Sequence, residues 1–157
     1  MTTKLLVVYQ SRSGGVQKIV DAFISGVTLA AEQTTRKITV LSQHPFDTVA
    51  ADVIAAHAVV VATPEHFGSM AGATKHFFEE IWHECLEETV GKPWQLIVKA
   101  GNDGTGAVQS VERLVTGLQW AKFRPPLQVI GDITETDTNS AVELGASLAA
   151  SIELGLV

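Results

Sequence analysis

Short runs of consecutive apolar residues alternate along the chain with longer segments whose apolar residues recur every three or four positions. Short apolar runs that are bounded by turn residues are typical of strands buried in a sheet. We therefore expect five strands. They are Leu5–Tyr9, Lys37–Leu41, Ala58–Ala62, Trp94–Lys99 and Leu127–Ile130, the third ending at Thr63-Pro64.

The segments between these runs have the spacing of amphipathic helices. From Val16 onward, Ile19, Phe23 and Val27 fall on one helical face. We expect four further helices. One is capped by Asp47 and runs through Ile54, one runs from about Met70 to Leu86, one covers 108–118, and the last starts near Thr138–Ala141.

Strict alternation of strands and helices predicts an α/β fold, because parallel strands need crossover connections and helices supply them. The predicted architecture is a doubly wound, five-stranded parallel sheet between two helical layers, a three-layer sandwich. The length of 157 residues fits one domain, 1–157. The alternation alone leaves the order of the strands open.

Composition and charge narrow the classes of function. The chain has a net charge of -6 and 11 Lys and Arg residues, which argues against nucleic-acid binding. No apolar stretch approaches the roughly 18 residues that span a bilayer. The single cysteine, Cys85, excludes an internal disulfide and fits a reducing compartment. We expect a cytoplasmic protein with no nucleic-acid or membrane partner.

The corner between the first strand and the first helix reads SRSGGV, residues 11–16. A helix N-terminus attracts anions, and two glycines let its N–H groups converge on one point. Hydroxyls of Ser11 and Ser13 add donors, so we expect a phosphate held mostly by neutral groups. The corner is neither a P-loop nor a G-x-G-x-x-G fingerprint. The alternative is a plain turn that caps the helix.

Two further loops follow strands at the same predicted edge of the sheet. They are TPEHFGSMAG, residues 63–72, and the glycine-rich AGNDGTGA, residues 100–107. Together with the corner at 11–16, they resemble the flavodoxin-like FMN proteins, nearest the NAD(P)H-dependent FMN reductase and quinone reductase branches. The resemblance covers essentially the whole chain, and residues 63–72 are its most specific part. It implies the strand order 2-1-3-4-5, one bound FMN and NAD(P)H as the electron donor.

The resemblance also assigns residues to the cofactor by position. In this family the first loop holds the phosphate, and the other two loops flank the flavin ring. By this resemblance, Ser11, Ser13, Gly14, Gly15 and Val16 are expected to surround the phosphate group, and Arg12 occupies a variable place with its side chain near the phosphate or the ribityl chain. One side of the ring is lined by Thr63, Pro64, Glu65, His66, Phe67 and Gly68, and the other by Gly101, Asn102, Asp103, Gly104 and Gly106.

The chain departs from the family pattern in three places. Gly15-Val16 stands where the family often has Asn-Thr, which removes a hydroxyl donor. The loop at 100–107 lacks the aromatic residue that electron carriers usually place against the ring. The insertion that longer quinone reductases carry after the fourth strand is absent. These departures bear on the subfamily rather than on the fold.

Two side chains in the loop at 63–68 are candidates for contact with the cofactor or for catalysis. Phe67 either covers the flavin ring or fills a core or interface position. His66 is the one candidate catalytic residue, because a histidine side chain can give or take a proton near neutral pH. The alternative is a solvent-facing loop histidine.

Other chemically active side chains have simpler interpretations. The segment His76–Glu88 has His and Glu residues one turn apart, but a solvated helix face explains it as well as a metal site, and we expect no metal. Cys85 fits a buried small residue better than a reactive thiol. His44 and His57 are expected to lie outside the ligand-binding end, and no role is assigned to them.

Three functions are consistent with these residues. The first is an FMN-binding oxidoreductase that passes electrons from NAD(P)H to flavin, quinone or another small acceptor. The second is a short flavodoxin that carries electrons between protein partners, and the third is a relative of the fold that binds no flavin. Relatives of this type are commonly dimers or tetramers, and the sequence leaves the oligomeric state open between homodimer and homotetramer.

Overall fold

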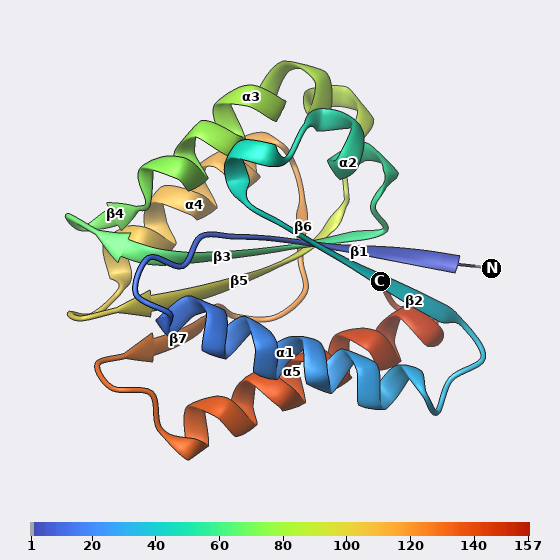
Figure 1. Ribbon diagram of the computed structural model, residues 1–157. Coiled ribbons are helices and arrows are strands. Elements are labelled where there is room, and N and C mark those ends of the chain that lie inside the picture. The colour runs from blue at the N-terminus through green and yellow to red at the C-terminus, as the bar shows by residue number, and fades with distance from the viewer. Residues whose placement is uncertain (1) are drawn as a thin grey trace.

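The computed structural model describes residues 2–157, which form a parallel sheet with helices on both faces (Figure 1). The parallel strands are β1 (Thr2–Tyr9), β2 (Lys37–Gln43), β3 (Ala58–His66), β5 (Pro93–Ala100), β6 (Ala121–Lys122) and β7 (Leu127–Ile130). Their order is β2-β1-β3-β5-β6, and β7 also pairs with β5. The predicted order 2-1-3-4-5 is confirmed, since β5 and β7 are the expected fourth and fifth strands.

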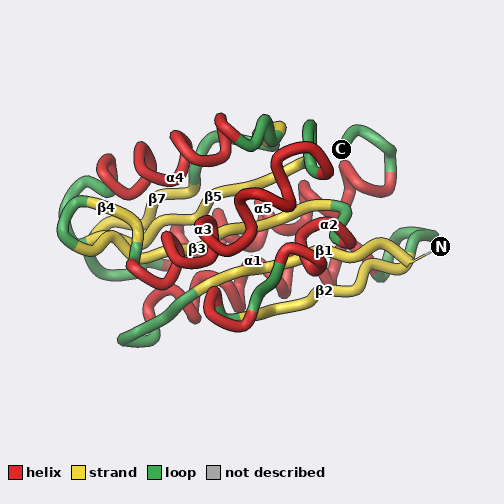
Figure 2. The backbone as a smooth tube through the Cα atoms, turned by 90° about the horizontal axis from the view of Figure 1, so that it is seen from above, coloured by secondary structure: helices red, strands yellow, loops and turns green. Residues whose placement is uncertain are grey.

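The helices form two layers around this sheet (Figures 1 and 2). One layer contains α1 (Gly15–Ala31) and α5 (Glu135–Glu153), and the other contains α2 (Ala50–Ala55), α3 (Gly72–Glu88) and α4 (Thr105–Gly117). The three-layer sandwich and its five α-helices are therefore as predicted. Among residues 2–157, none of the helices combines the length and the apolar character that a membrane crossing requires.

Alternation along the strands creates two separate cores. Leu6 of β1 and Val59 of β3 are register partners on the face covered by α3 and α4, whereas Leu5 and Val60 face α1 and α5. All four side chains are buried, with an exposed fraction of at most 1%. Both faces of the central strands are covered, which explains why the sequence shows continuous apolar runs instead of polar-apolar alternation.

Several boundaries differ from the prediction. Asp47 does not cap a helix, because it ends a short 3-10 helix, η1 (Pro45–Asp47), and α2 begins only after Val49. The last helix begins at Glu135 instead of near Thr138, since the Thr134 hydroxyl caps it by accepting the N–H of Asp137. The sheet edge beside β5 is split between β6 and β7, with Pro125-Pro126 interrupting it.

The prediction that Pro64 ends the third strand is wrong. Strand β3 continues to His66, turns at Phe67-Gly68 and returns as β4 (Ser69–Met70), which pairs antiparallel with it. Strand β1 ends at Tyr9 opposite Ala62, so β3 has lost one neighbour at Pro64, the edge setting in which a sheet tolerates proline. Because Met70 belongs to this hairpin, α3 starts at Gly72 and not at Met70.

The β3–β4 hairpin is fastened to the first turn of α4. The Ser110 hydroxyl accepts the N–H of Met70 at 2.9 Å and donates to the carbonyl of Ala107 at 2.9 Å. Glu65 accepts the N–H of Ala107 at 3.2 Å, so its carboxylate occupies the positive end of the helix. At Gly106 a Cβ atom would lie 1.9 Å from the carbonyl oxygen of Gly68, so only glycine permits this approach.

Helices α1 and α5 also cross in backbone contact. A Cβ atom at Gly26 would lie 2.0 Å from the carbonyl oxygen of Val142, and one at Gly145 would lie 2.0 Å from that of Phe23. The two glycines therefore let α1 and α5 approach closely on one face of the sheet. This contact fixes the position of α1, whose first turn forms part of the site described below.

We expect Gly26→Ala to destabilise the fold by about 2–3 kcal/mol, because the new methyl group overlaps backbone that cannot move aside. Urea unfolding followed by circular dichroism measures the change. Gly72→Ala is the control, since a Cβ atom there has no heavy atom within 4 Å and its cost is expected to be near zero. Equal effects of the two variants would contradict the close helix contact.

We expect Ser110→Ala to loosen the hairpin, because the N–H of Met70 loses its acceptor. The loss should be about 1 kcal/mol, and amide exchange at Met70 should speed up about fivefold or more. Hydrogen exchange with residue-level readout tests this expectation. Ser25→Ala is the control, because the Ser25 hydroxyl is exposed and bonds only within α1. Unchanged exchange at Met70 would show that Ser110 does not hold the hairpin.

Candidate functional site

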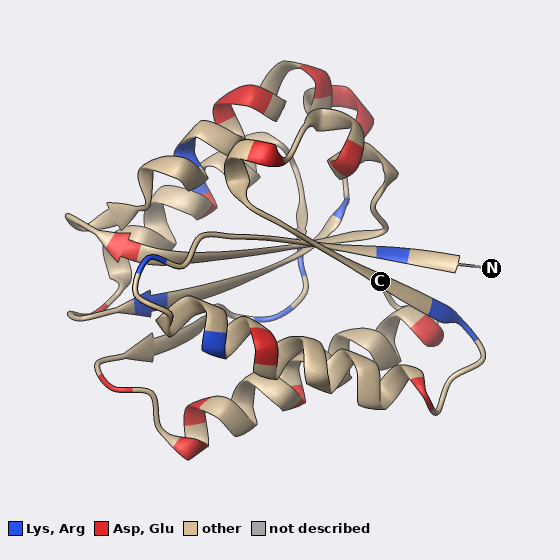
Figure 3. Ribbon diagram, in the orientation of Figure 1, with Lys and Arg blue, Asp and Glu red and all other residues tan. Residues whose placement is uncertain are grey.

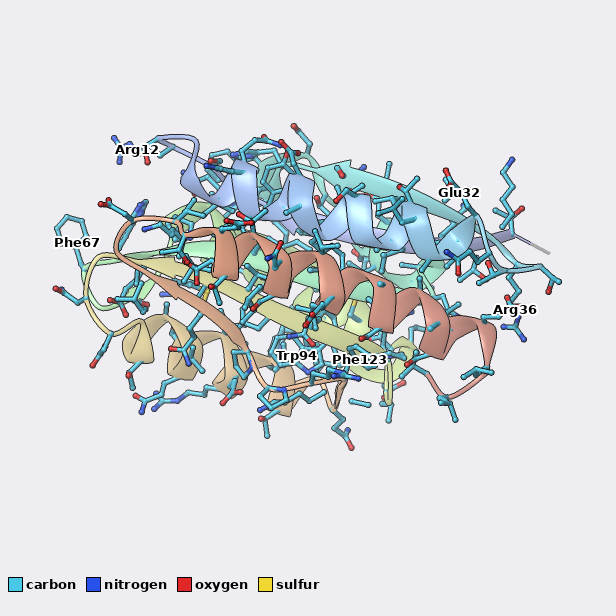
Figure 4. The ribbon with its side chains drawn as sticks, turned by 90° about the horizontal axis from the view of Figure 1, so that it is seen from below. Arg12, Glu32, Arg36, Phe67, Trp94 and Phe123 are labelled. Atoms are coloured by element: carbon cyan, nitrogen blue, oxygen red, sulfur yellow. The ribbon has the colours of Figure 1, made fainter. Side chains whose placement is uncertain are left out.

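Loops after three parallel strands meet at the carboxyl edge of the sheet. We call residues 10–14 with the start of α1 loop 1, residues 63–72 loop 3, and residues 101–106 loop 4. Figure 4 shows Arg12 of loop 1 and Phe67 of loop 3 at one end of the molecule, with Glu32 and Arg36 at the opposite end. Ligands of open α/β sheets bind at this edge, as the sequence analysis expects.

Loop 1 leaves main-chain donors open at the start of α1. Gly14 has φ 90° and ψ −9°, a left-handed conformation that glycine adopts without strain. The Ser11 hydroxyl accepts the N–H of Gln17 at 3.0 Å, whereas the hydrogen bonds found within residues 2–157 give no acceptor to the N–H groups of Gly15 and Val16. The first turn of this 17-residue helix is therefore free to bind an anion.

The side chains of loop 1 differ in what they contribute. Val16 is only 3% exposed and packs into the core under α1, so it offers the site its main chain alone. That burial explains why a valine is accepted where the family often has threonine. Arg12 and Ser13 are exposed, and the Arg12 side chain extends away from the body of the protein (Figure 4).

A lysine that the sequence analysis treats only as a strand residue lies beside loop 1. Lys99 is half-buried near the end of β5, and its Cγ and Cε atoms lie 3.6 Å from the position of a Cβ atom on Gly15. The sequence analysis expected a phosphate held mostly by neutral donors and did not include this lysine. In the sequence, Lys99 could have been recognised as a candidate because it is a charged residue near the carboxyl end of an otherwise apolar strand.

The groups around loop 1 fit a phosphate. Main-chain N–H groups at a helix N-terminus, nearby hydroxyls and one ammonium group are the donors that phosphate oxygens accept from. At Gly14 a Cβ atom would have no heavy atom within 4 Å, so the cradle is open to solvent on that side. This donor set suits the phosphate end of a flavin mononucleotide.

In loop 3, two of the expected site residues use their side chains to hold the loop. Thr63 is fully buried, and its hydroxyl accepts the N–H of Ala71 at 3.0 Å and receives the Thr74 hydroxyl at 3.2 Å. The Glu65 carboxylate binds the first turn of α4, as described above. These two side chains therefore fix the main chain of loop 3 between β3 and α3.

The tip of loop 3 presents an aromatic ring to solvent. Phe67 and Gly68 have φ values of 52° and 70°, positive at both central residues as in a type I′ turn. A positive φ is rare for phenylalanine, and its side chain is fully exposed, which excludes the core position considered above. Half-exposed His66 precedes it. A strained turn therefore holds an unpacked aromatic ring at the rim of the site.

Loop 4 is a short turn that leads into α4. Asp103 accepts the N–H of Thr105 at 3.0 Å, and Gly104 is buried with φ 75°. Gly106 packs against the loop 3 tip, so loops 3 and 4 form one connected unit. The accessible part of loop 4 is Gly101, Asn102 and Asp103.

The expectation that His44 lies outside the ligand-binding end is wrong. His44 follows β2, whose carboxyl end lies at the same edge because β2 is parallel to β1. The edge here contains a polar pocket of about 210 Å³, lined by Tyr9, Ser11, Gln17, Ser42, Gln43 and His44. The sequence analysis left out the loop after the second strand, and so it missed this pocket.

The remaining candidates behave as buried or solvated side chains. Glu80 and Glu84 are exposed on α3, a helix that carries several acidic residues (Figure 3). Within residues 2–157 no three His, Cys, Asp or Glu side chains are grouped to hold a metal ion. Cys85 is buried as expected, and burial, with the nearby Glu84 charge, raises the pKa of its thiol to about 11. A thiol in this state is inert.

Comparisons with known proteins agree with this architecture. A family model described as NADPH-dependent FMN reductase matches residues 21–132, a region that begins after loop 1. A comparison with curated proteins gave no match. The structural comparisons cover nearly the whole chain, and at the identities given below they establish the fold alone.

Three solved structures illustrate the similarity of fold. A flavodoxin from the domain Archaea is 19% identical, with a TM-score of 0.78 over 96% of this chain and 99% of its own. An oxidoreductase from Corynebacterium diphtheriae is 18% identical, with a TM-score of 0.77 over 98% of both chains. Rubredoxin oxygen:oxidoreductase from Desulfovibrio gigas is 14% identical, with a TM-score of 0.79 over 98% of this chain and 37% of that longer chain.

The family match and the fold lead to the same assignment. The matched region, residues 21–132, covers more than half of the chain. It includes loops 3 and 4, and the structure places these beside the open helix N-terminus of loop 1. The chain therefore belongs to the NADPH-dependent FMN reductase family and is a flavodoxin-like, FMN-binding oxidoreductase.

Proposed function

We propose that the protein binds FMN at the carboxyl edge of the sheet and uses NADPH to reduce a small acceptor such as a free flavin or a quinone. The observation that carries the proposal is the open first turn of α1, where the N–H groups of Gly15 and Val16 have no protein acceptor, next to loops 3 and 4. A phosphate bound there directs the rest of the cofactor across the edge of the sheet toward the other two loops.

Each loop has a distinct part in this proposal. Loop 1 binds the phosphate through main-chain donors from Gly14 to Val16, assisted by Ser11 and Ser13. Main-chain groups of residues 64–68 and 101–103 line the two sides of the flavin ring. Thr63 and Glu65 act indirectly, because their side chains fix loop 3 in place instead of facing the ligand.

The proposed electron transfer depends on access to the ring. When bound, FMN would supply the hydride chemistry that connects NADPH to the acceptor. The protein orients the ring and leaves one face open, because loop 4 offers only Gly101, Asn102 and Asp103 on its side. Phe67 stands at the rim, where its exposed ring can stack on a flat ligand. His66 is the proton donor nearest to this rim in sequence.

One observation favours a second function, a carrier of electrons between proteins. The chain matches an archaeal flavodoxin along 99% of that chain's length, and it carries exposed carboxylates on α3 (Figure 3). A carrier docks with redox proteins through such charges instead of oxidising NADPH itself. The two functions differ in whether NADPH alone reduces the bound flavin.

We expect the purified protein to take up FMN saturably and to lose its visible flavin absorbance when mixed with NADPH without oxygen. The same experiment with NADH in place of NADPH shows which of the two nucleotides reduces the flavin faster. Absence of bleaching by either nucleotide would support the carrier and contradict the reductase. Absence of saturable FMN uptake would contradict both flavin functions.

We expect Gly14→Val to weaken FMN binding about tenfold or more, which corresponds to about 1.4 kcal/mol. A β-branched residue disfavours the φ of 90° that directs the N–H groups of the first helical turn. Fluorescence titration with FMN measures the affinity. Gly91→Val is the control, because Gly91 has a similar φ of 76° but lies before β5, at the opposite edge. Equal losses in both variants would show that strain alone, and not loop 1, weakens binding.

A further inference from the structure

Lys99 is placed on the side of the sheet from which α1 starts. Side chains two positions apart in a strand share a face, and Ile97 lies in the core covered by α1 and α5. The aliphatic stem of Lys99 runs against Gly15, the first residue of α1, with Cγ and Cε 3.6 Å from its Cβ position. The Nζ atom is one covalent bond beyond Cε, so its charge lies next to the open helix N-terminus.

The charge of Lys99 has no strong partner within residues 2–157. The two ion pairs found there join Lys75 to Glu79 and Lys122 to Glu112. The Nζ atom of Lys99 makes one long hydrogen bond, 3.4 Å, to the carbonyl of Ala100. The half-buried lysine and the positive end of α1 therefore lie side by side, an arrangement that favours an anion between them.

Asp137, in the first turn of α5, is close enough to Lys99 to interact with its charge. Hydrogen bonds from Thr134 hold the pKa of Asp137 below its ordinary value, and the charge of Lys99 makes only a smaller contribution. The Asp137 carboxylate accepts the N–H and the hydroxyl of Thr134, each at 2.8 Å. Asp137 is thus engaged as a helix cap at α5 and does not serve as the contact partner of Lys99.

We propose that Lys99 is the cationic partner of the FMN phosphate and gives the site its preference for FMN over riboflavin, an inference that rests on the proposed function of loop 1. Packing against Gly15 holds the ammonium group near the phosphate before binding, so little side-chain freedom is lost. Two other cations lie near the phosphate site, Arg12 in loop 1 and Lys18 in the first turn of α1, but both are exposed, and the Arg12 side chain extends into solvent (Figure 4). Lys99 therefore contributes more to phosphate affinity than Arg12.

The test compares the affinities of FMN and riboflavin, which differ in the phosphate alone. We expect Lys99→Met, which keeps most of the unbranched stem, to weaken FMN binding about tenfold or more and to change riboflavin binding less than about twofold. Lys99→Arg should retain FMN affinity within about threefold, because it keeps the charge. Inorganic phosphate should compete with FMN less effectively in Lys99→Met than in the unmodified protein.

Lys4→Met is the matched control, because Lys4 is an exposed lysine of β1 remote from the carboxyl edge and its loss changes the net charge equally. Equal FMN affinities of Lys4→Met and Lys99→Met would overturn the proposal. Equal losses of FMN and riboflavin affinity in Lys99→Met would overturn it as well, since they indicate a structural effect.

A salt titration of the unmodified protein makes the test independent of any variant's folding. FMN affinity should fall as salt rises and riboflavin affinity should not, because only the phosphate interacts with the charge. FMN affinity that is independent of salt would overturn the role of Lys99 while leaving FMN binding itself intact. A failure of the unmodified protein to bind FMN would instead contradict the proposed function.

Discussion

Burial of both faces of one parallel sheet is the constraint on which the rest of this structure depends. Each central strand must present apolar side chains to two helical layers, and each crossover must return the chain to the same edge. The loops after β1, β2, β3 and β5 therefore meet at the carboxyl edge. Close backbone contact between α1 and α5 at Gly26 and Gly145 fixes the helix that opens this site.

At that edge, side chains fix the loops in place, and the main chain supplies the open hydrogen-bond donors. Thr63, Glu65 and Ser110 bind main-chain groups of neighbouring elements and so make loops 3 and 4 one rigid unit. The donors left open belong mainly to the main chain at the start of α1. A site built from main-chain groups is insensitive to many substitutions, which is consistent with a shared fold at less than 20% identity to the solved structures.

The family match supports the assignment to the reductases, whereas the geometry of the carboxyl edge bears on where the phosphate binds. The family match covers loops 3 and 4 but begins after loop 1, so the proposed phosphate site is argued from the open helix N-terminus and from the position of Lys99. The shortness of loop 4 and the exposed ring of Phe67 are the features of this edge that bear on the proposed acceptor. Those features suit a reductase of small acceptors better than a carrier whose flavin is covered.

The sequence by itself determined the layers, the strand and helix alternation and the three loops of the candidate site, because apolar periodicity and glycine-rich turns are local signals. It did not determine the β3–β4 hairpin, since Pro64 reads locally as a strand end and is tolerated only because β1 has already ended. Nor did it bring Lys99 to Gly15 or His44 to the shared edge. Only the tertiary structure decided these positions, because they depend on strand order, on register and on the packing of α1 across β5, which join residues far apart in the chain.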